Sequence, residues 1–217
     1  MTTQTGQYEL IKKYLAPEWS TERIQIKDSK IQDVPLLTEI FNSCNYVEHW
    51  DPTFYIVEES ELKQLVKRSL SKTVNNRGFR LQCLEVKHSG KIIGYFHLQH
   101  YSPRLPQPAT AFISMFVVHP EFQGKRYAQE VVAGLARQLA ELGYIAIWLE
   151  VYLKNWPAIR FWVQQGFNKI IEYDGADQFS ETAQATLILE RRLKVNNRIK
   201  IEKFNHRGMD DSQQKKV

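Results

Sequence analysis

A short basic segment, Gln-Gly-Lys-Arg at residues 123–126, joins an apolar run that ends at Val118 to a helical pattern. A strand that leads directly into a helix presents unpaired backbone N–H groups, backed by the positive end of the helix dipole. Gly124 allows a ligand to approach the backbone closely, and Lys125 and Arg126 add positive charge. The segment therefore predicts an anion site that suits a pyrophosphate. The alternative is an ordinary turn with two solvated bases, and neither a Walker loop nor a G-x-G-x-x-G motif is present.

A second motif lies about thirty residues further on, after another apolar segment, and reads Asn-Trp-Pro-Ala-Ile-Arg-Phe-Trp-Val-Gln-Gln-Gly-Phe over residues 155–167. Together the two segments resemble the GNAT superfamily of N-acetyltransferases, which move an acyl group from acyl-coenzyme A. The first resembles the family's Q/R-x-x-G-x-G/A loop, from Gln123 to Ala128. The second matches N-x-x-A-x-x-F/L-Y-x-x-x-G-F at Asn155, Ala158, Phe161, Gly166 and Phe167.

The resemblance covers residues 23–193 and implies both a fold and a cofactor. The implied fold is α/β (α+β), with a mixed, mostly antiparallel sheet of about seven strands, helices on both faces and a V-shaped splay between the two central parallel strands. Those strands are residues 111–118 and 145–152 here. The implied cofactor is acetyl-coenzyme A (acetyl-CoA), whose pantetheine arm would pair with the first of them like an added strand. The residues that would bind it are Phe116, Val117, Val118, Gln123, Gly124, Lys125, Arg126, Tyr127, Ala128, Asn155, Ala158, Phe161 and Trp162.

Two residues depart from the family pattern. Arg126 stands where the loop usually has its first glycine, so that either the backbone is less accessible there or the guanidinium itself takes a phosphate. Trp162 stands where the family often has a tyrosine that protonates the departing thiolate, and an indole N–H does not give up its proton near neutral pH. A thiol with a pKa of about 8.5 can leave without a dedicated acid. We predict Tyr152, at the end of the preceding strand, as the substitute donor; the alternative is that it merely lines the cleft.

Direct attack by an amine on the thioester needs that amine unprotonated, and hence a base or a water path to one. Asn155 would hydrogen-bond the cofactor arm or a water near the sulfur, and an N–H among residues 116–118 would polarise the thioester carbonyl. We predict Glu150, Tyr152 and Asn155 as the catalytic residues. Other candidate bases, each of which could instead be a solvated or structurally paired group, are Glu48, His49, Asp51, Glu85, His97 and His100.

Residues 45–56 combine aromatic side chains with carboxylates and lie between two predicted helices. In the family, the first two helices and the hairpin strands usually build the acceptor site. An aromatic wall with carboxylates suits a small amine or a basic peptide terminus, and simple packing beneath a long loop is the alternative. The predicted acceptor-binding residues are Tyr46, His49, Trp50, Asp51 and Glu85.

The elements that must position these residues follow from hydrophobic periodicity and turn signals. Alternating or continuous apolar segments predict strands at 23–27, 79–87, 91–101, 110–118, 145–152, 168–173 and 184–193. Apolar residues spaced by three and four predict helices at 31–44, 58–72, 128–142 and 157–165. Cys44 and Cys83 are expected to be small buried hydrophobes, and we predict neither a disulfide scaffold nor a metal site.

Length and composition are those of one globular domain: 217 residues, 43% hydrophobic and 24% charged, with no apolar run long enough for a membrane span. The formal charge of +5 is concentrated near the end of the chain. Residues 191–217 hold nine Lys or Arg and three acids, whereas the other 190 residues hold 20 and 21. We therefore expect a leader at 1–22, a GNAT-like domain at 23–193 and a basic, flexible tail at 194–217.

The leading hypothesis is a cytoplasmic N-acyltransferase, since residues 1–14 do not resemble a secretory signal. It would move an acetyl group from acetyl-CoA to a primary amine of a small molecule or peptide. The alternative is a catalytically inactive coenzyme A binding or sensing module of the same fold, motivated by Arg126 and Trp162. Nucleic-acid binding through the tail is disfavoured, because Phe204 is the tail's one aromatic residue. No membrane partner is expected, and a homodimer is compatible with the sequence.

Overall fold

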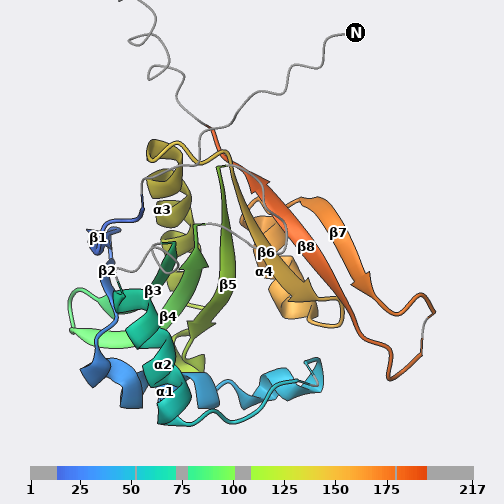
Figure 1. The fold of residues 1–217 in the computed structure, drawn as a ribbon, viewed down its shortest axis with the longest axis horizontal. Coiled ribbons are helices and arrows are strands. Elements are labelled where there is room, and N and C mark those ends of the chain that lie inside the picture. Colours follow the sequence, from blue (N-terminus) through green and yellow to red (C-terminus); the bar gives the residue numbers. More distant parts are fainter. Residues whose placement is uncertain (1–13, 52, 72–77, 101–108, 179, 195–217) are drawn as a thin grey trace, which may run out of the picture.

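The computed structural model describes residues 14–51, 53–71, 78–100, 109–178 and 180–194. They form one eight-stranded sheet in the order β1-β2-β3-β4-β5-β6-β8-β7, in which the one parallel pair is β5 and β6 (Figure 1). The strands are β1 (Glu18–Ser20), β2 (Ile24–Asp28), β3 (Phe79–Val86), β4 (Lys91–Gln99), β5 (Thr110–Val118), β6 (Ala146–Tyr152), β7 (Lys169–Gly175) and β8 (Ala185–Arg192). The helices are α1 (Val34–Asn42), α2 (Glu59–Leu70), α3 (Tyr127–Glu141) and α4 (Trp156–Gln164), with 3-10 turns at Ile31–Asp33, Asn45–His49 and Pro120–Phe122.

The predicted fold class is confirmed, because the sheet is mixed and mostly antiparallel and has helices on both faces. It has one strand more than the seven predicted. That strand, β1, lies in the predicted leader, where Trp19 is paired with Ile26 of β2 and Leu15 is buried in the core. The folded part of the chain thus begins before the predicted boundary at residue 23, since a three-residue strand is too short to show a period in the sequence. The predicted tail lies outside the described residues, apart from Lys194.

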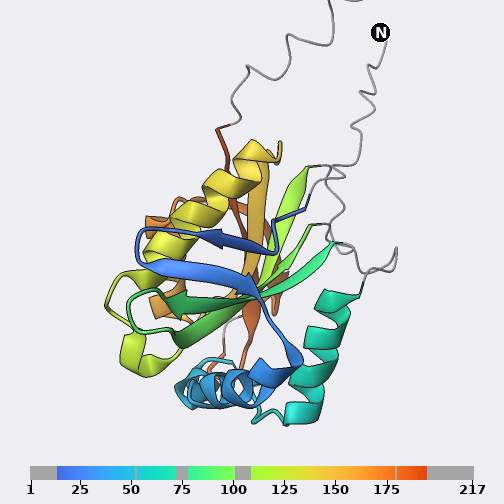
Figure 2. The same ribbon diagram turned by 90° about the vertical axis from the view of Figure 1, so that its left-hand side faces the viewer.

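The two larger hydrophobic cores lie on opposite faces of the sheet, and Figure 2 shows α3 on the other side of the sheet from α1 and α2. Val131, Leu135 and Leu139 recur at helical spacing in α3 and are fully buried in the larger core. Helices α1 and α2 pack over β3 and β4 through residues such as Leu37 and Val66. No helix among the described residues has the length and apolar character needed to cross a membrane.

Strands β5 and β6 pair only from Thr110 opposite Ala146 to Ile113 opposite Leu149. Beyond Ile113, β5 stays paired with β4 and β6 stays paired with β8, so the two central strands diverge (Figure 1). The β4–β5 register skips Ser114, which makes a bulge directly after the last residue of β5 that pairs with β6. A bulge bends and twists its strand, which accounts for the divergence. The predicted V-shaped splay is confirmed.

Candidate active site

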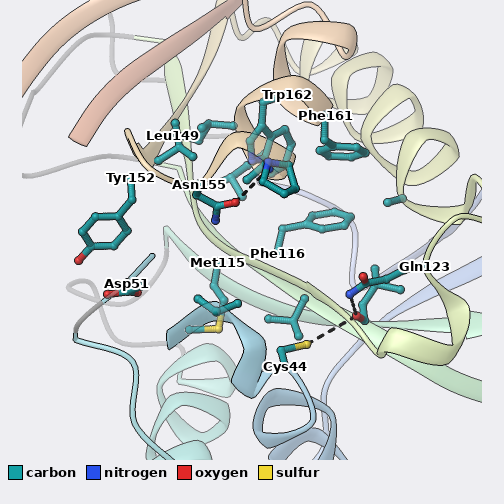
Figure 3. A pocket seen from close by; sticks show the side chains of 18 of the residues that line it. Cys44, Asp51, Met115, Phe116, Gln123, Leu149, Tyr152, Asn155, Phe161 and Trp162 are labelled. Carbon is teal, nitrogen blue, oxygen red and sulfur yellow. Dashed lines mark hydrogen bonds between the residues drawn. The ribbon is translucent and has the colours of Figure 1, made fainter. Parts of the chain in front are cut away.

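The splay between β5 and β6 opens into a cavity of about 810 Å³ (Figure 3). Its walls are the diverging ends of the two strands, the N-terminal ends of α3 and α4, and the loop that follows α1. The predicted site residues that line it are Tyr46, Trp50, Asp51, Phe116, Val117, Val118, Gln123, Gly124, Arg126, Tyr127, Ala128, Glu150, Tyr152, Asn155, Ala158, Phe161 and Trp162. The cavity thus brings together residues from both predicted motifs and from the aromatic loop.

Three predicted site residues lie outside the cavity lining and make other contacts. His49 stacks on the neighbouring indole ring, with ring centroids 5.9 Å apart. The Lys125 ammonium lies over the ring of Phe122, 4.9 Å from its centroid. Strand β4 separates β3 from the splay, so that Glu85 of β3 lies away from the cavity and pairs with Lys27 at 3.2 Å.

Two histidines considered as bases, His97 and His100, are buried and do not line the cavity. Burial lowers the pKa of His97 to about 3 and that of His100 to about 4. Nε2 of His100 accepts a hydrogen bond from Leu15 N–H at 3.0 Å, and Nδ1 therefore carries the proton that it shares with the Gly78 carbonyl at 2.8 Å. Both rings are neutral structural groups at neutral pH, and neither is placed to deprotonate an amine in the cavity.

The predicted anion site forms the corner between β5 and α3. Gln123 holds this corner in place. Its Nε2 donates to the Val118 carbonyl at 2.9 Å (Figure 3), and it also donates to the Tyr46 hydroxyl at 2.8 Å. The first bond fixes the corner to the end of β5, and the second fixes it to the loop after α1. The wall that faces the predicted phosphate site is therefore joined directly to the predicted acceptor loop.

Arg126 is the N-cap residue of α3 and has φ +63°, in the left-handed region that disfavours residues other than glycine. This backbone conformation explains why the resembled loop usually has glycine at the position. Arg126 is exposed and lines the cavity, and no hydrogen bond or ion pair within the described part of the chain engages its guanidinium. Glu130, one turn into the helix, is paired with Arg23 at 2.6 Å. The first turn of α3 thus keeps a positive character that favours an anion.

Replacing Arg126 with glycine is expected to separate stability from anion binding. The R126G change relieves the left-handed backbone strain, which stabilises the folded state, but glycine also makes the unfolded chain more flexible, which opposes this gain. The free energy of unfolding should therefore stay level or rise by up to about 1 kcal/mol. The dissociation constant for acetyl-CoA should rise about tenfold, because a charge-assisted contact is lost. Chemical denaturation and calorimetry measure the two effects. The matched control is A109G, since Ala109 also has a positive φ, of 60°, but lies outside the cavity lining. Equal affinity in R126G and A109G would contradict the assignment.

The N-terminus of α4 contributes a second wall. Asn155 caps this helix, because its Oδ1 accepts a hydrogen bond from Ala158 N–H at 3.1 Å. The amide oxygen is engaged in the cap, so a ligand would be contacted through the amide nitrogen. Trp162 is buried and packs edge-on against Phe116 and Phe161, with ring centroids 5.7 and 4.8 Å apart. Its indole forms an apolar wall and supplies no proton to a thiolate.

Tyr152, Thr53 and Asp51 form a hydrogen-bonded chain on the β6 side of the cavity. Tyr152 Oη lies 3.2 Å from Thr53 Oγ1, which donates to Oδ1 of Asp51 at 2.6 Å. Glu150, two residues before Tyr152 and hence on the same face of β6, accepts a hydrogen bond from Thr186 at 2.7 Å. Burial raises the pKa of the Tyr152 phenol, and the carboxylates of Asp51 and Glu150 raise it further. Tyr152 is therefore protonated at neutral pH.

Residues 36–167, more than half of the chain, match the Acetyltransferase (GNAT) family. The chain belongs to this family. The recognition that rested on the two motifs is thus confirmed. A curated relative, the [ribosomal protein bS18]-alanine N-acetyltransferase of Haemophilus ducreyi, is 30% identical over 115 residues, which cover 53% of this chain and 75% of the relative.

Solved GNAT structures share the fold at low sequence identity. A probable GNAT family acetyltransferase from Chromobacterium violaceum superposes with a TM-score of 0.68 at 14% identity, covering 88% of this chain and 94% of that one. The ribosomal L7/L12 alpha-N-protein acetyltransferase RimL, in complex with coenzyme A, superposes with a TM-score of 0.64 at 12% identity, covering 81% and 97%. The cofactor of the family is acetyl-CoA, which confirms the cofactor prediction.

The cavity of this GNAT protein fits acetyl-CoA. His119 N–H donates to Ile93 of β4, so strand alternation turns the main-chain groups of Phe116 and Val118 away from β4, into the gap where β6 no longer pairs. The carbonyl of Val118 is taken by Gln123, which leaves Phe116 as the main partner for a pantetheine arm. The α3 N-terminus adjoins this strand end and suits the pyrophosphate. When bound, the cofactor would supply the acetyl thioester, and these groups would hold and orient it.

Sequence reasoning missed three residues of the GNAT site. Cys44 was predicted only as a buried hydrophobe, yet it lines the cavity with its thiol 3.7 Å from the Val118 carbonyl, and burial raises the pKa of that thiol. Thr53 had one usable signal, its position two residues after Asp51, which is the spacing of an Asx turn. Nothing in the sequence marks Ser114, because its bulge depends on the pairing of β5 with β4.

Proposed function

We propose that this GNAT protein is an acetyl-CoA dependent N-acetyltransferase that transfers the acetyl group directly to a primary amine. The observation that carries the proposal is the cavity, where an anion-binding helix corner, an open strand edge and titratable side chains meet. Asp51 and Glu150 attract the cationic form of an amine to the β6 side of the cavity. Tyr152 holds a phenolic proton beside them, in place of the tyrosine that is replaced by Trp162.

Exposed hydrophobic side chains near the cavity mouth favour a polypeptide as the acceptor. Trp156 is 70% exposed, Ile56 60% and Tyr55 57%; Leu153 and Tyr46 extend this rim. Tyr46 and Tyr55 line the cavity, and the other three adjoin lining residues in the chain. An enclosed small amine leaves such a rim unused, whereas exposed Trp and Tyr side chains commonly anchor protein contacts. The Haemophilus ducreyi relative, named as a ribosomal-protein alanine N-acetyltransferase, supports the same acceptor class.

Release of coenzyme A thiol tests this function. The full-length protein is expected to bind acetyl-CoA in calorimetry and to release thiol when peptides with free N-termini are added. The same peptides with blocked N-termini are the control, and lysine-containing versions separate the α-amine from the ε-amine. Binding of acetyl-CoA without thiol release by any peptide or small amine would contradict the proposal. It would favour the alternative, an inactive coenzyme A binding module, for which Trp162 and Arg126 are the supporting observations.

Replacing Trp156 with alanine is expected to raise KM for a peptide acceptor about tenfold, because an exposed indole anchor is worth about 1 to 2 kcal/mol. KM for acetyl-CoA should not change. The matched control is I170A, because Ile170 on β7 is 60% exposed and lies outside the cavity lining. Steady-state kinetics with one peptide and one small amine measure the effect. If W156A and I170A behave alike with the peptide, the rim does not bind the acceptor.

A further inference from the structure

The Tyr152 hydroxyl points across the mouth of the cavity toward Asp51, on the loop after α1 (Figure 3). Thr53 joins the two groups: its hydroxyl oxygen lies 3.2 Å from Tyr152 Oη and 2.6 Å from Asp51 Oδ1. The backbone N–H of Thr53 donates to the same carboxylate oxygen at 2.9 Å, which fixes the Thr53 side chain relative to Asp51. Three side chains from two distant parts of the chain thus form one continuous row of hydrogen bonds.

The direction of these hydrogen bonds follows from counting protons. An ionised carboxylate only accepts, so the single hydroxyl proton of Thr53 points to Asp51. Thr53 Oγ1 can then meet Tyr152 only as an acceptor, and Tyr152 donates its own proton to Thr53. A lone pair of Tyr152 Oη is left to accept a proton from a group in the cavity. In this arrangement Tyr152 is placed to take up a proton before it gives one away.

We propose that Asp51, Thr53 and Tyr152 form a proton relay that accepts the proton of the attacking amine and returns it to the departing sulfur. This inference rests on the proposed function and names Asp51, through Thr53, as its proton acceptor. Sequence reasoning predicted Tyr152 as an acid and left Asp51 among several candidate bases. The row of hydrogen bonds gives the two residues one shared task, and it gives Thr53 a role as the positioning residue between them.

The proton transfers through the relay balance over one turnover. As the acceptor nitrogen bonds to the acetyl carbon, its proton passes to Tyr152 Oη, the Tyr152 proton passes to Thr53 Oγ1, and the Thr53 proton passes to Asp51. As the carbon–sulfur bond breaks, each proton moves back by one place, and Tyr152 protonates the sulfur. The amide and the thiol are formed with no net change in the protein. An acceptor that arrives as an ammonium ion first loses one proton to solvent.

The experiment compares wild type with T53V, T53S and D51N in steady-state kinetics across pH, with T182V as a matched control. Thr182 is exposed in the turn before β8 and lies outside the cavity lining. T53V is expected to lower kcat ten- to hundredfold and to move the rising limb of the pH profile to higher pH, without changing the acetyl-CoA dissociation constant. T53S should restore kcat to within about threefold, because it keeps the hydroxyl. The T53V/D51N double variant should lose no more than the worse single variant, because both act through one relay.

Several titratable groups share the cavity, so the pH profile alone does not assign the relay. Those lining it are Cys44, Tyr46, Asp51, Tyr55, Arg126, Tyr127, Glu150 and Tyr152. The second readout is therefore the Tyr152 titration, followed by NMR of protein labelled at the tyrosine ring carbon that bears the hydroxyl. D51N should lower the pKa of Tyr152, because the Asp51 carboxylate raises it, while T182V should leave it unchanged. This readout does not require turnover.

Four results would overturn the relay. Two come from kcat: T53V behaves like T182V, or the losses in kcat multiply in the T53V/D51N double variant. The other two are an unchanged Tyr152 titration in D51N and an alkaline shift of the pH profile of kcat in E150Q but not in D51N. The last would identify Glu150 as the base. Failure of the proposed function looks different, since the wild type would then bind acetyl-CoA and release no thiol with any amine. An enzyme that is active and insensitive to T53V would keep the function and reject the relay.

Discussion

The Y152F variant is expected to lose about 10²- to 10⁴-fold in kcat while binding acetyl-CoA as tightly as the wild type. The change removes one oxygen, and with it the phenolic hydroxyl that lines the cavity beside Thr53. Trp162 cannot replace this proton, because an indole N–H does not ionise near neutral pH. Thiol release under saturating acetyl-CoA measures kcat, and calorimetry measures the affinity for the cofactor.

The matched control for this variant is Y173F. Tyr173 lies on β7, is 49% exposed and donates its hydroxyl proton to the Ala176 carbonyl, away from the cavity lining. Y173F should retain full activity. An active wild type with an equally active Y152F would remove Tyr152 from the mechanism. A wild type that binds acetyl-CoA without turnover would instead support the inactive module, in which Tyr152 only lines a cleft.

The folded protein is expected to lose about 4 kcal/mol of unfolding free energy between pH 7 and pH 5, in nearly equal parts from His97 and His100. Burial lowers the pKa of His97 to about 3 and that of His100 to about 4, from the ordinary value of 6.5, and the positive charges of Arg68 and Arg80 add to these effects. Because the folded-state pKa is the lower one, the unfolded chain binds more protons as the pH falls through 6.5. The neutral rings therefore stabilise the fold fully above pH 6.5, and this contribution is lost toward pH 4 and below.

Replacing His97 with methionine separates the two contributions. His97 Nε2 is buried and has no hydrogen-bond partner in the described structure, so the H97M change removes no bond at that atom. The pH 7 to pH 5 loss should fall from about 4 to about 2 kcal/mol, with a change at pH 7 below about 1.5 kcal/mol. Urea unfolding at the two pH values measures both quantities. The exposed His88 provides the control, since H88A should keep the full loss. An unchanged pH dependence in H97M would show that His97 does not cause it.

The cofactor side of the site could be read from the sequence because it is built locally. The end of β5, the corner at residues 123–126 and the first turn of α3 are contiguous, so their spacing alone predicts an anion site. Asn155 and Ala158 meet within one helix turn for the same reason. The left-handed φ of Arg126 was not predictable in the same way, because the residue type argues against it.

The acceptor side could not be derived in this way, because its contacts join residues that are far apart in the chain. Thr53 and Tyr152 are 99 positions apart, and Tyr46 and Gln123 are 77 apart. Glu85 shows what periodicity leaves undetermined. The period-two pattern places the Glu85 side chain on one face of its strand, but the pattern does not give the number of strands between that residue and the splay.

Local sequence patterns therefore determine which segments become strands and helices and where an anion can bind. The reason is that turn and helix hydrogen bonds, and the periodicity of side chains, involve residues only a few positions apart. Strand order, the bulge at Ser114 and the row from Asp51 to Tyr152 depend on which segments pack together. Those contacts form only when the whole sheet and both cores are assembled. The basic corner at residues 123–126 is therefore determined by local sequence, whereas the proton relay is determined by the tertiary structure.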